Sequence, residues 1–421
     1  MIKIKEKIKI LWLSDSPLTC TGFATISKNI LNKLPKNKYE CHFIGHNYYG
    51  QTLIPGTTFE DGTKIDFYVH GTGKQPYSAD IIEGLIRELK PDIFGVLLDS
   101  FMLMQSGYLN KDLGPAKTIM YYPSDGGSGL PLGCENILRK FHVNVAMARF
   151  GQRQVKDVHG IETLCIPHAI DTKVYHPLTI TEKNKLKQKY GLLGKFVVGT
   201  VARNQGRKML DRTIKSFARF AKGKDDVMLF CHTDPEDVAQ VFNLKELVNR
   251  YKLNNKVVFS GMKYFKGFHY LDMNKVYNVM DVFFLSTSGE GFGVPTIEAM
   301  GCEIPCVVTD YTTTHELLVE DGKCGLPVKL SGVSSAPYGE QATINQYEYD
   351  KLLDNGTITG SWNVERGIMD VEDGAKQLQL LYDDKDLRKN LGMIGRQKVL
   401  KIYDWDVVMS EWDKVFSEMV K

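Results

Sequence analysis

A glycine-rich segment flanked by acidic residues is the part of the sequence best suited to bind an anion. Residues 286–300 read STSGEGFGVPTIEAM, with Glu290 and Glu298 eight positions apart and Gly291 and Gly293 just after the first of them. The apolar run before this segment predicts a buried strand, and the residues after its proline predict a short helix. Glycines let a ligand come close to the backbone, and the first N–H groups of a helix favour a phosphate or a sugar oxygen. The segment therefore predicts an anion-binding turn with two carboxylates facing one pocket.

A cluster of cations follows another apolar run in the same half of the chain. Residues 202–208 read ARNQGRK directly after the run 196–201. Arginine presents a planar fork to phosphate oxygens and lysine a movable point charge, so this loop could grip a diphosphate without a metal. Basic residues more often lie on a solvated face. The loop alone leaves both interpretations open.

Two polar loops in the N-terminal half also follow apolar runs. Residues 13–23 read LSDSPLTCTGF, with Gly22 near the start of a helical pattern, and residues 121–127 read YYPSDGG, with Asp125 after a strand pattern. Ligands of parallel sheets bind at the carboxyl ends of strands, which favours a role for both loops. Each also fits ordinary capping or turn chemistry, so neither is decisive by itself.

Composition limits the class of protein. The 421 residues are 43% hydrophobic and 24% charged, which indicates a soluble chain of two domains. The net charge of +3 is much smaller than the strongly basic charge that is typical of a dedicated nucleic-acid-binding protein. This charge still allows peripheral contact with an anionic surface. The eight cysteines are scattered without a C-x-x-C pair, and no run of about 18 apolar residues occurs. We therefore expect a cytoplasmic protein without a transmembrane segment.

Strand and helix patterns alternate in two blocks, which predicts an α/β protein with two doubly wound parallel sheets. The strands expected in the first block are 8–13, 40–44, 64–69, 93–98, 118–122, 143–146 and 163–166, and its helices are 23–34, 79–89, 134–141 and 150–158. The strands expected in the second block are 196–201, 227–231, 256–259, 281–285 and 305–308. Its helices are 210–221, 238–251, 274–279, 296–300 and 313–319, followed by helices at 371–382, 385–402 and 405–420. The alternating residues 1–10 are expected to be a half-exposed strand.

These segments together resemble retaining glycosyltransferases of family 4, which have the GT-B fold. The segments that carry the resemblance are 290–300, 202–208, 166–172, 175–177, 315–318, 321–322 and 403–405. The resemblance implies two Rossmann-like domains facing across a cleft, with a nucleotide-diphosphate sugar in the C-terminal domain and the acceptor in the N-terminal one. The expected boundaries are an N-terminal domain at 1–175, a linker at 176–193, a C-terminal domain at 194–402 with a polar insertion at 331–367, and a helix crossing back at 403–421.

The resemblance also implies roles for individual residues. Arg203 and Lys208 would bind the donor diphosphate, Glu298 the ribose hydroxyls and Glu290 the sugar hydroxyls. Four further positions would line the donor site through their backbone: Gly22, Phe292, Gly293 and Val294. Met262, in a loop after a strand of the second block, is a candidate contact for the base.

The sequence departs from this family in two loops. Where many relatives have a glycine pair, this chain has Gly22 alone, and where they have a histidine it has Asp125. Asp125 would then take over part of the histidine's role at the sugar or the acceptor, and counts with Glu290, Arg203 and Lys208 as a catalytic candidate. We expect no cofactor and no metal, because in this fold the leaving phosphate itself could accept the acceptor's proton.

Other function classes fit part of the pattern. A nucleotide-sugar epimerase or phosphorylase could use the same fold, and a non-catalytic subunit could bind the nucleotide without turnover. For a transferase, the acceptor could be a glycan, a lipid-linked sugar, a small molecule, a protein or a modified nucleic-acid base.

Overall fold

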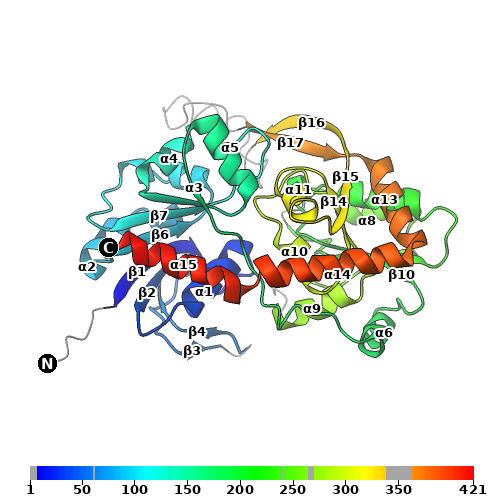
Figure 1. The fold of residues 1–421 in the computed structure, drawn as a ribbon, viewed down its shortest axis with the longest axis horizontal. Helices are drawn as coiled ribbons and strands as arrows, with labels where there is room; N and C mark the ends of the chain where they lie inside the picture. Colours follow the sequence, from blue (N-terminus) through cyan, green and yellow to red (C-terminus); the bar gives the residue numbers. More distant parts are fainter. Residues whose placement is uncertain (1–6, 60–61, 132, 239, 264–269, 338–362) are drawn as a thin grey trace.

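The chain folds into two α/β domains that lie side by side, with both ends of the described chain on the N-terminal domain (Figure 1). The structure, a computed structural model, describes residues 7–59, 62–131, 133–238, 240–263, 270–337 and 363–421. Most of the strand expected at residues 1–10 lies outside these ranges; within them, a strand begins at Ile8. No helix in the described ranges is long and apolar enough to cross a membrane.

The N-terminal domain is built on a seven-stranded sheet of order β5-β2-β1-β6-β7-β8-β9, in which every neighbouring pair is parallel. Its strands are β1 (Ile8–Asp15), β2 (Tyr39–His46), β5 (Tyr68–His70), β6 (Ile93–Leu97), β7 (Lys117–Tyr122), β8 (Val143–Ala146) and β9 (Leu164–Cys165). Its helices are α1 (Gly22–Lys33), α2 (Ile82–Leu89), α3 (Ser100–Gln105), α4 (Glu135–Lys140) and α5 (Arg149–His159). The strand expected at 64–69 is divided between β5 and β4 (Lys64–Ile65), which pairs with β3 (Thr57–Thr58) in a separate ladder.

The C-terminal domain is built on a six-stranded parallel sheet of order β12-β11-β10-β13-β14-β15. Its strands are β10 (Phe196–Val201), β11 (Val227–His232), β12 (Val257–Phe259), β13 (Val282–Leu285), β14 (Cys306–Thr309) and β15 (Gly325–Val328). Its helices are α7 (Leu210–Phe220), α8 (Leu244–Arg250), α9 (Tyr270–Asn278), α10 (Val294–Gly301), α11 (Thr313–Leu318), α13 (Val371–Asp383) and α14 (Lys385–Ile402). Helix α6 (Ile180–Lys189) precedes this sheet. The two doubly wound domains expected from the sequence are confirmed.

Strand order brings the two chemically distinctive segments of the C-terminal domain together. The order reverses at β10, whose neighbours are β11 on one side and β13 on the other. Parallel sheets bind ligands outside the carboxyl ends of strands at such a reversal. The cation loop 202–208 follows β10 and the glycine turn 286–293 follows β13, so both leave the sheet at this point.

One predicted helix begins later than expected, and several elements have no counterpart in the prediction. The helix expected from residue 238 begins at Leu244, because Asn204 hydrogen-bonds the segment before it: its Nδ2 donates to the carbonyl of Phe242 at 2.6 Å and its carbonyl accepts from the N–H of Val241. The insertion expected at 331–367 overlaps β16 (Leu330–Pro337) and β17 (Asn363–Met369), which form a separate antiparallel pair and extend slightly beyond the expected bounds. Helix α3 and strand β15 were not predicted either.

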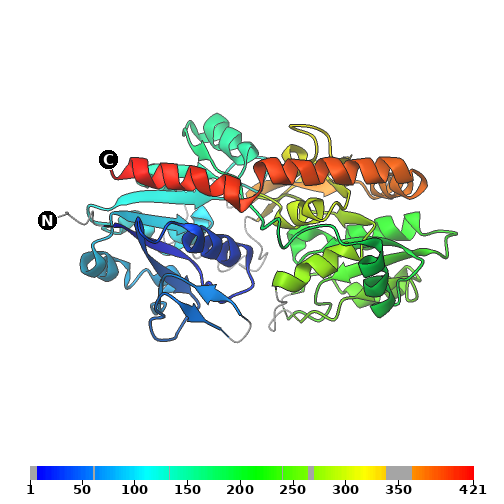
Figure 2. The same cartoon turned by 60° about the horizontal axis from the view of Figure 1, so that its bottom comes forward.

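The last helix, α15 (Trp405–Met419), lies on the N-terminal domain although it follows α14 of the C-terminal domain (Figures 1 and 2). Trp412 of α15 packs edge-on against Trp12 and Tyr121, with ring centroids 6.0 and 4.9 Å apart. The chain thus crosses between the domains near residues 170–176 and again at 403–405. The two crossings bond to each other, because Ile170 donates to the carbonyl of Tyr403 and accepts from Trp405.

Helices α5 and α11 form a charged contact between the domains. The Arg149 guanidinium lies 3.5 Å from a carboxylate oxygen of the buried Glu316, and the other oxygen of Glu316 accepts from the N–H of Phe150. Arg153 pairs with Glu320 at 2.9 Å on the exposed side of the same contact. Behind it, Lys398 of α14 donates to the carbonyls at the end of α11, which fixes that helix on its own domain.

Candidate functional site

The glycine turn ends in the helix start that the sequence predicts. Gly293 is the residue before α10 and has a φ of 101°, a conformation that favours glycine. Among the residues that the structure describes, no acceptor is found for the backbone N–H groups of Phe292, Gly293 and Val294. These donors lie at the positive end of the helix dipole, so they can bind a phosphate or sugar oxygen.

Two other glycines of the turn are needed for contact with the N-terminal domain. A Cβ atom at Gly289 would overlap the carbonyl oxygen of Asp125, and one at Gly291 would lie 2.6 Å from the Cβ of Pro123. The sequence suggested that Gly291 lets a ligand approach the backbone. The structure gives it a different neighbour, the loop after β7, so the turn brings the two domains into direct contact.

Glu290 is the centre of a buried ion cluster. Its two carboxylate oxygens accept from Lys208 Nζ at 2.6 Å and from Arg207 Nη1 at 2.9 Å. Burial alone would raise the pKa of Glu290, but Lys208 and Arg207 outweigh it and lower this pKa to about 2. The cations therefore keep the carboxylate ionised and are themselves fixed at the head of α10.

Backbone and hydroxyl groups connect the cation loop to the glycine turn. The N–H of Ser288 donates to the carbonyl of Arg207 at 2.7 Å, and the hydroxyl of Ser286 reaches the carbonyl of Met209 at 2.7 Å. Met209 has a φ of 45°, which ends the short 3-10 turn Gly206–Lys208 before α7. The two segments thus form one rigid unit rather than two loops that a ligand would have to bring together.

Arg203 lies at the end of β10 and pairs with another carboxylate. Its Nε is 2.7 Å from Oδ2 of Asp237, whose side chain is 1% exposed. The sequence placed Arg203 and Lys208 on the same diphosphate. The structure holds them in two separate ion pairs, one on Asp237 and one on Glu290, so each cation has a carboxylate that fixes its direction.

Glu298 has a different environment from Glu290. It lies about one turn inside α10 and accepts from the hydroxyl of Tyr277 at 2.5 Å. Burial of the carboxyl raises the pKa of Glu298 to about 7, although hydrogen bonds from Tyr175 and Tyr277 act in the opposite direction. The two carboxyls of the motif therefore have opposite shifts and can carry different protonation states near neutral pH.

The loop after β1 places Gly22 at the start of α1. Thr21 caps this helix by accepting from the N–H of Ala24, and its hydroxyl donates to Asp15 at 2.6 Å. A Cβ at Gly22 would meet nothing within 4 Å, so open space lies beside this residue. Its place in the donor site stays a prediction.

Met262 follows β12 in the loop that the sequence suggested for the base. Its N–H lies 3.4 Å from the hydroxyl of Ser260, and the preceding Gly261 has a φ of 79°. The next residue, Lys263, pairs with Glu236 at 2.7 Å. Met262 therefore lies after a strand end of the C-terminal sheet. Its contact with the base stays a prediction.

Asp125 is held by a residue that the sequence did not single out. The Arg366 Nη1 of β17 donates to the carbonyl of Asp125 at 2.8 Å and lies 3.2 Å from its Oδ2. Arg207 and Asp237 were also missed as partners. The position of Arg207 beside Lys208 was a signal for it, but Arg366 lies in a polar segment without periodicity. Asp237 directly precedes the helix predicted at 238–251.

Phe292 connects the glycine turn to the crossing between domains. Its ring lies 4.9 Å from that of His168 and 5.7 Å from that of Tyr403. His168 Nδ1 is 2.7 Å from the hydroxyl of Tyr121, and burial lowers the pKa of this histidine to about 3. His168 is therefore neutral at physiological pH, and its contacts indicate a packing role.

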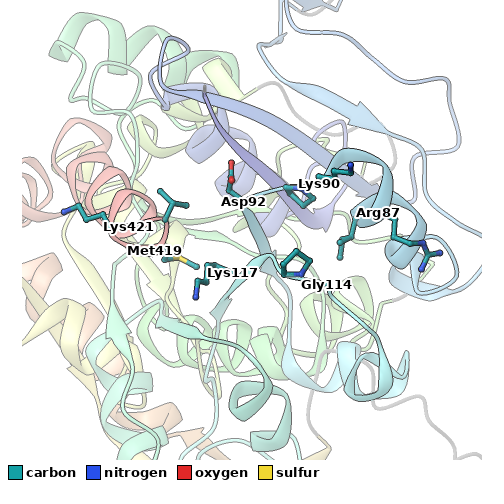
Figure 3. A pocket seen from close by; sticks show the side chains of 11 residues that line it. Arg87, Lys90, Asp92, Gly114, Lys117, Met419 and Lys421 are labelled. Atoms are coloured by element: carbon teal, nitrogen blue, oxygen red, sulfur yellow. The ribbon is translucent and has the colours of Figure 1, made fainter. Parts of the chain in front are cut away.

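A separate hollow of about 770 Å³ lies near the amino-terminal ends of β6 and β7 in the N-terminal sheet (Figure 3). The residues labelled there are Arg87, Lys90, Asp92, Gly114, Lys117, Met419 and Lys421. Asp92 and Lys117 mark the amino-terminal ends of β6 and β7, whereas ligands of parallel sheets bind at carboxyl ends. Size alone therefore does not make this hollow the candidate site. Its basic lining is where contact with an anionic surface would be tested.

No group of three or more His, Cys, Asp or Glu side chains in the described ranges is arranged to hold a metal ion. The expectation of metal-independent chemistry without a cofactor stays a prediction.

Comparison with known proteins agrees with this arrangement. Residues 182–336 match the family model described as Glycosyl transferases group 1. Sucrose-phosphate synthase from Thermosynechococcus elongatus is similar in structure, with a TM-score of 0.74 at 14% identity over 98% of this chain and 99% of that one. HepE from Anabaena, solved with UDP and glucose, has a TM-score of 0.68 at 16% identity over 98% and 100%. The chain has the GT-B fold.

The sequence similarity covers a smaller part of the chain than the structural similarity does. The mannosylfructose-phosphate synthase of Agrobacterium fabrum is 30% identical over 151 residues, which are 34% of this chain and 32% of that protein. The chain spans between 32% and 56% of the length of the first three curated relatives that it matches. The segment matched by the family model contains the cation loop and the glycine turn. Asp125 and Arg366 lie outside it.

Proposed function

We propose that the protein is a retaining, metal-independent glycosyltransferase that moves a sugar from a nucleotide-diphosphate sugar to an acceptor hydroxyl. The observation that carries the proposal is the ion cluster of Glu290, Lys208 and Arg207 at the head of α10, beside backbone N–H groups without a protein acceptor in the described ranges. The cations and N–H groups suit the negative charge of a diphosphate, and the Glu290 carboxylate can accept hydrogen bonds from a sugar bound beside it. The comparisons do not favour the epimerase, phosphorylase or non-catalytic alternatives.

The proposed reaction breaks the bond between the anomeric carbon and the diphosphate oxygen, and this oxygen takes the electron pair. Lys208, Arg203 and the amides of residues 292–294 would stabilise the negative charge that develops on the phosphates. Because their ion pairs fix the two cations in advance, little reorganisation is needed as the charge forms. The acceptor oxygen would form the new bond on the same face of the sugar while its proton passes to the leaving phosphate. This order of events retains the anomeric configuration.

The carboxyls would bind the neutral parts of the donor. Glu290 is ionised at all physiological pH values, so it can accept hydrogen bonds from sugar hydroxyls. Glu298, one turn further along α10, would accept from the ribose hydroxyls. Asp125 would approach the sugar or the acceptor from the N-terminal domain, and Gly22 and Met262 would line the site at the diphosphate and the base.

The donor class is a nucleoside diphosphate sugar, and UDP-sugars are the first to test, since HepE was solved with UDP-glucose and the pneumococcal GtfA with UDP and GlcNAc. The acceptor is proposed only as a molecule with a hydroxyl group. A glycan, a lipid-linked sugar and a modified nucleic-acid base are the acceptors to screen.

The test is ligand binding followed by turnover. We expect UDP, GDP or one of their sugars to raise the melting temperature, because a ligand at a hundred times its Kd stabilises by about 2.7 kcal/mol. Turnover should persist in EDTA. Stabilisation by none of these ligands would contradict the nucleotide site, and loss of turnover in EDTA would contradict the metal-independent mechanism.

A further inference from the structure

A buried arginine of the β16–β17 pair lies where the two domains meet. Only 3% of the surface of Arg366 is exposed. Its contacts are with Asp125 of the N-terminal domain, through both the backbone carbonyl and the carboxylate. Burying an ion pair is expensive in desolvation and is weak support for stability, so the pair calls for another explanation.

The backbone fixes this arginine against the glycine turn. The N–H of Gly367 donates to the carbonyl of Ser288 at 3.0 Å, while the N–H of Gly127 donates to the carbonyl of Glu365 at 3.0 Å. Strand β17 is therefore bonded on one side to the segment that precedes Glu290 and on the other to the Asp125 loop. Arg366 lies between them, in contact with the Asp125 loop and directly before Gly367, which bonds to Ser288.

Three buried polar atoms at this point lack a hydrogen-bond partner among the residues that the structure describes. They are Oγ of Ser124, Oδ1 of Asp125 and Nη2 of Arg366. Nearly all buried polar atoms in native proteins are paired, so three on neighbouring groups indicate a place that a polar ligand completes. The set includes an acceptor from the carboxylate and a donor from the guanidinium.

We propose that Arg366 and Asp125 together bind one hydroxyl group of the donor's sugar, an inference that rests on the function proposed above. A hydroxyl donates one hydrogen bond and accepts another, which matches Oδ1 of Asp125 and Nη2 of Arg366. The 3.2 Å ion pair keeps the two side chains together. Both atoms are closed to solvent, so the hydroxyl reaches them when the Asp125 loop moves away from the glycine turn.

This pair would determine which sugar is accepted. A site that hydrogen-bonds a substrate hydroxyl discriminates strongly against an analogue without it, because its own polar groups are then left unpaired. Arg366 lies outside residues 182–336, the segment shared with the group 1 family model. The sugar preference would therefore depend on a strand that the shared segment does not contain.

The experiment compares a nucleotide with its sugar conjugate. UDP, UDP-glucose, GDP and GDP-mannose are titrated calorimetrically into the full chain and into Arg366→Lys, Asp125→Asn and Arg153→Ala. We expect both site variants to lose about tenfold in affinity for the sugar conjugate while the affinity for the free nucleotide stays within about twofold, as for one hydrogen bond to a charged group. Arg153→Ala removes a contact between the domains away from this point and should keep the ratio of the two affinities.

Analogues locate the hydroxyl. The wild type should bind the deoxy derivative that lacks the recognised hydroxyl about tenfold more weakly than the complete sugar conjugate. Arg366→Lys should bind this derivative and the complete conjugate with equal affinity, because the variant has already lost the contact. Unchanged affinity ratios in both site variants would overturn the inference, as would an equal loss for nucleotide and conjugate. Failure of the wild type to bind any of the four probes would instead contradict the proposed function itself. Asp125→Asn keeps the test valid if Arg366→Lys does not fold.

Discussion

The two sides of the candidate site are held in different ways. On the C-terminal side, Glu290, Lys208 and Arg203 belong to ion pairs made entirely within their own domain, at adjacent strand ends. On the N-terminal side, Asp125 is held by Arg366, which belongs to the other domain. The C-terminal half of the site can therefore form in a single domain, whereas the N-terminal half takes its arrangement only when the domains are in contact.

This difference indicates a division of work. A rigid, pre-paired group of charges suits the diphosphate, which every donor of this class has in common. A contact that forms between domains suits recognition of the sugar, which varies. The predictions below test this division, beginning with the largest expected effect.

Loss of Lys208 should affect the C-terminal side most strongly. Lys208→Ala removes a cation from the proposed diphosphate site and leaves Glu290 with Arg207 alone. We expect turnover or donor hydrolysis to fall by about 10²–10³-fold, and unfolding free energy to fall by about 1.5–3 kcal/mol. An assay with labelled donor measures the turnover or hydrolysis rate, and chemical denaturation measures the unfolding free energy. Lys215→Ala, which removes an i,i+4 pair on α7, is the matched control, and equal activity in the two variants would remove Lys208 from the site.

The Arg203–Asp237 pair tests whether the carboxylate serves to orient its cation. Asp237→Asn keeps Arg203 and removes the charge that fixes it, so the affinity for nucleoside diphosphate should fall less than in Arg203→Ala. The double variant should lose less than the sum of the two single losses, because both act on one pair. Calorimetric titration of nucleoside diphosphate into all three variants gives the coupling free energy between Arg203 and Asp237. Additive losses would mean that the pair does not act as a unit.

The opposite shifts of the two carboxyls should be visible in the pH dependence of stability. The folded state holds the proton of Glu298 up to about pH 7, whereas the unfolded chain releases it near 4.5. The wild type should therefore lose stability relative to Glu298→Gln as pH rises from about 4.5 to 7, by at most about 1.4 kcal/mol per pH unit. For Glu290, whose folded pKa is about 2, the wild type should instead lose stability relative to Glu290→Gln as pH falls from 4.5 towards 2. The test is to measure the melting temperatures of the wild type and the two variants over pH 3–8. If the three plots of melting temperature against pH ran parallel, the opposite pKa shifts of the two carboxyls would be contradicted.

The smallest effect is expected at the exposed contact between α5 and α11. Arg153→Ala removes an ion pair in which the arginine is 49% exposed, so its effect on the unfolding free energy should lie within about 0.5 kcal/mol and vanish at high salt. Nucleotide affinity should not change. A large loss of affinity would show that the C-terminal half of the site depends on the domain contact after all.

The sequence predicted the elements better than it predicted the partners of the site residues. Apolar runs bounded by turn residues identified all strands of both sheets except β15, because buried parallel strands have a recognisable composition. The glycine turn and the cation loop were identified for the same local reason. The pairing of Arg203 with Asp237 was not, because it joins residues 34 positions apart at the ends of two different strands, and no local pattern indicates such a contact. Arg366 had no local signal, because its contact with Asp125 depends on the position of β17 between the domains.

The two crossings between domains have a mechanical consequence. The chain passes between the domains at Ile170 and at Asp404, and these two residues are bridged to each other. Thr172 also donates from its hydroxyl to the Asp404 carboxylate at 2.5 Å. Two connections fastened together resist twisting more than a single flexible connection would. We therefore expect the main relative motion of the domains to be a rotation about an axis near these crossings, which would move Asp125 away from Arg366 and back.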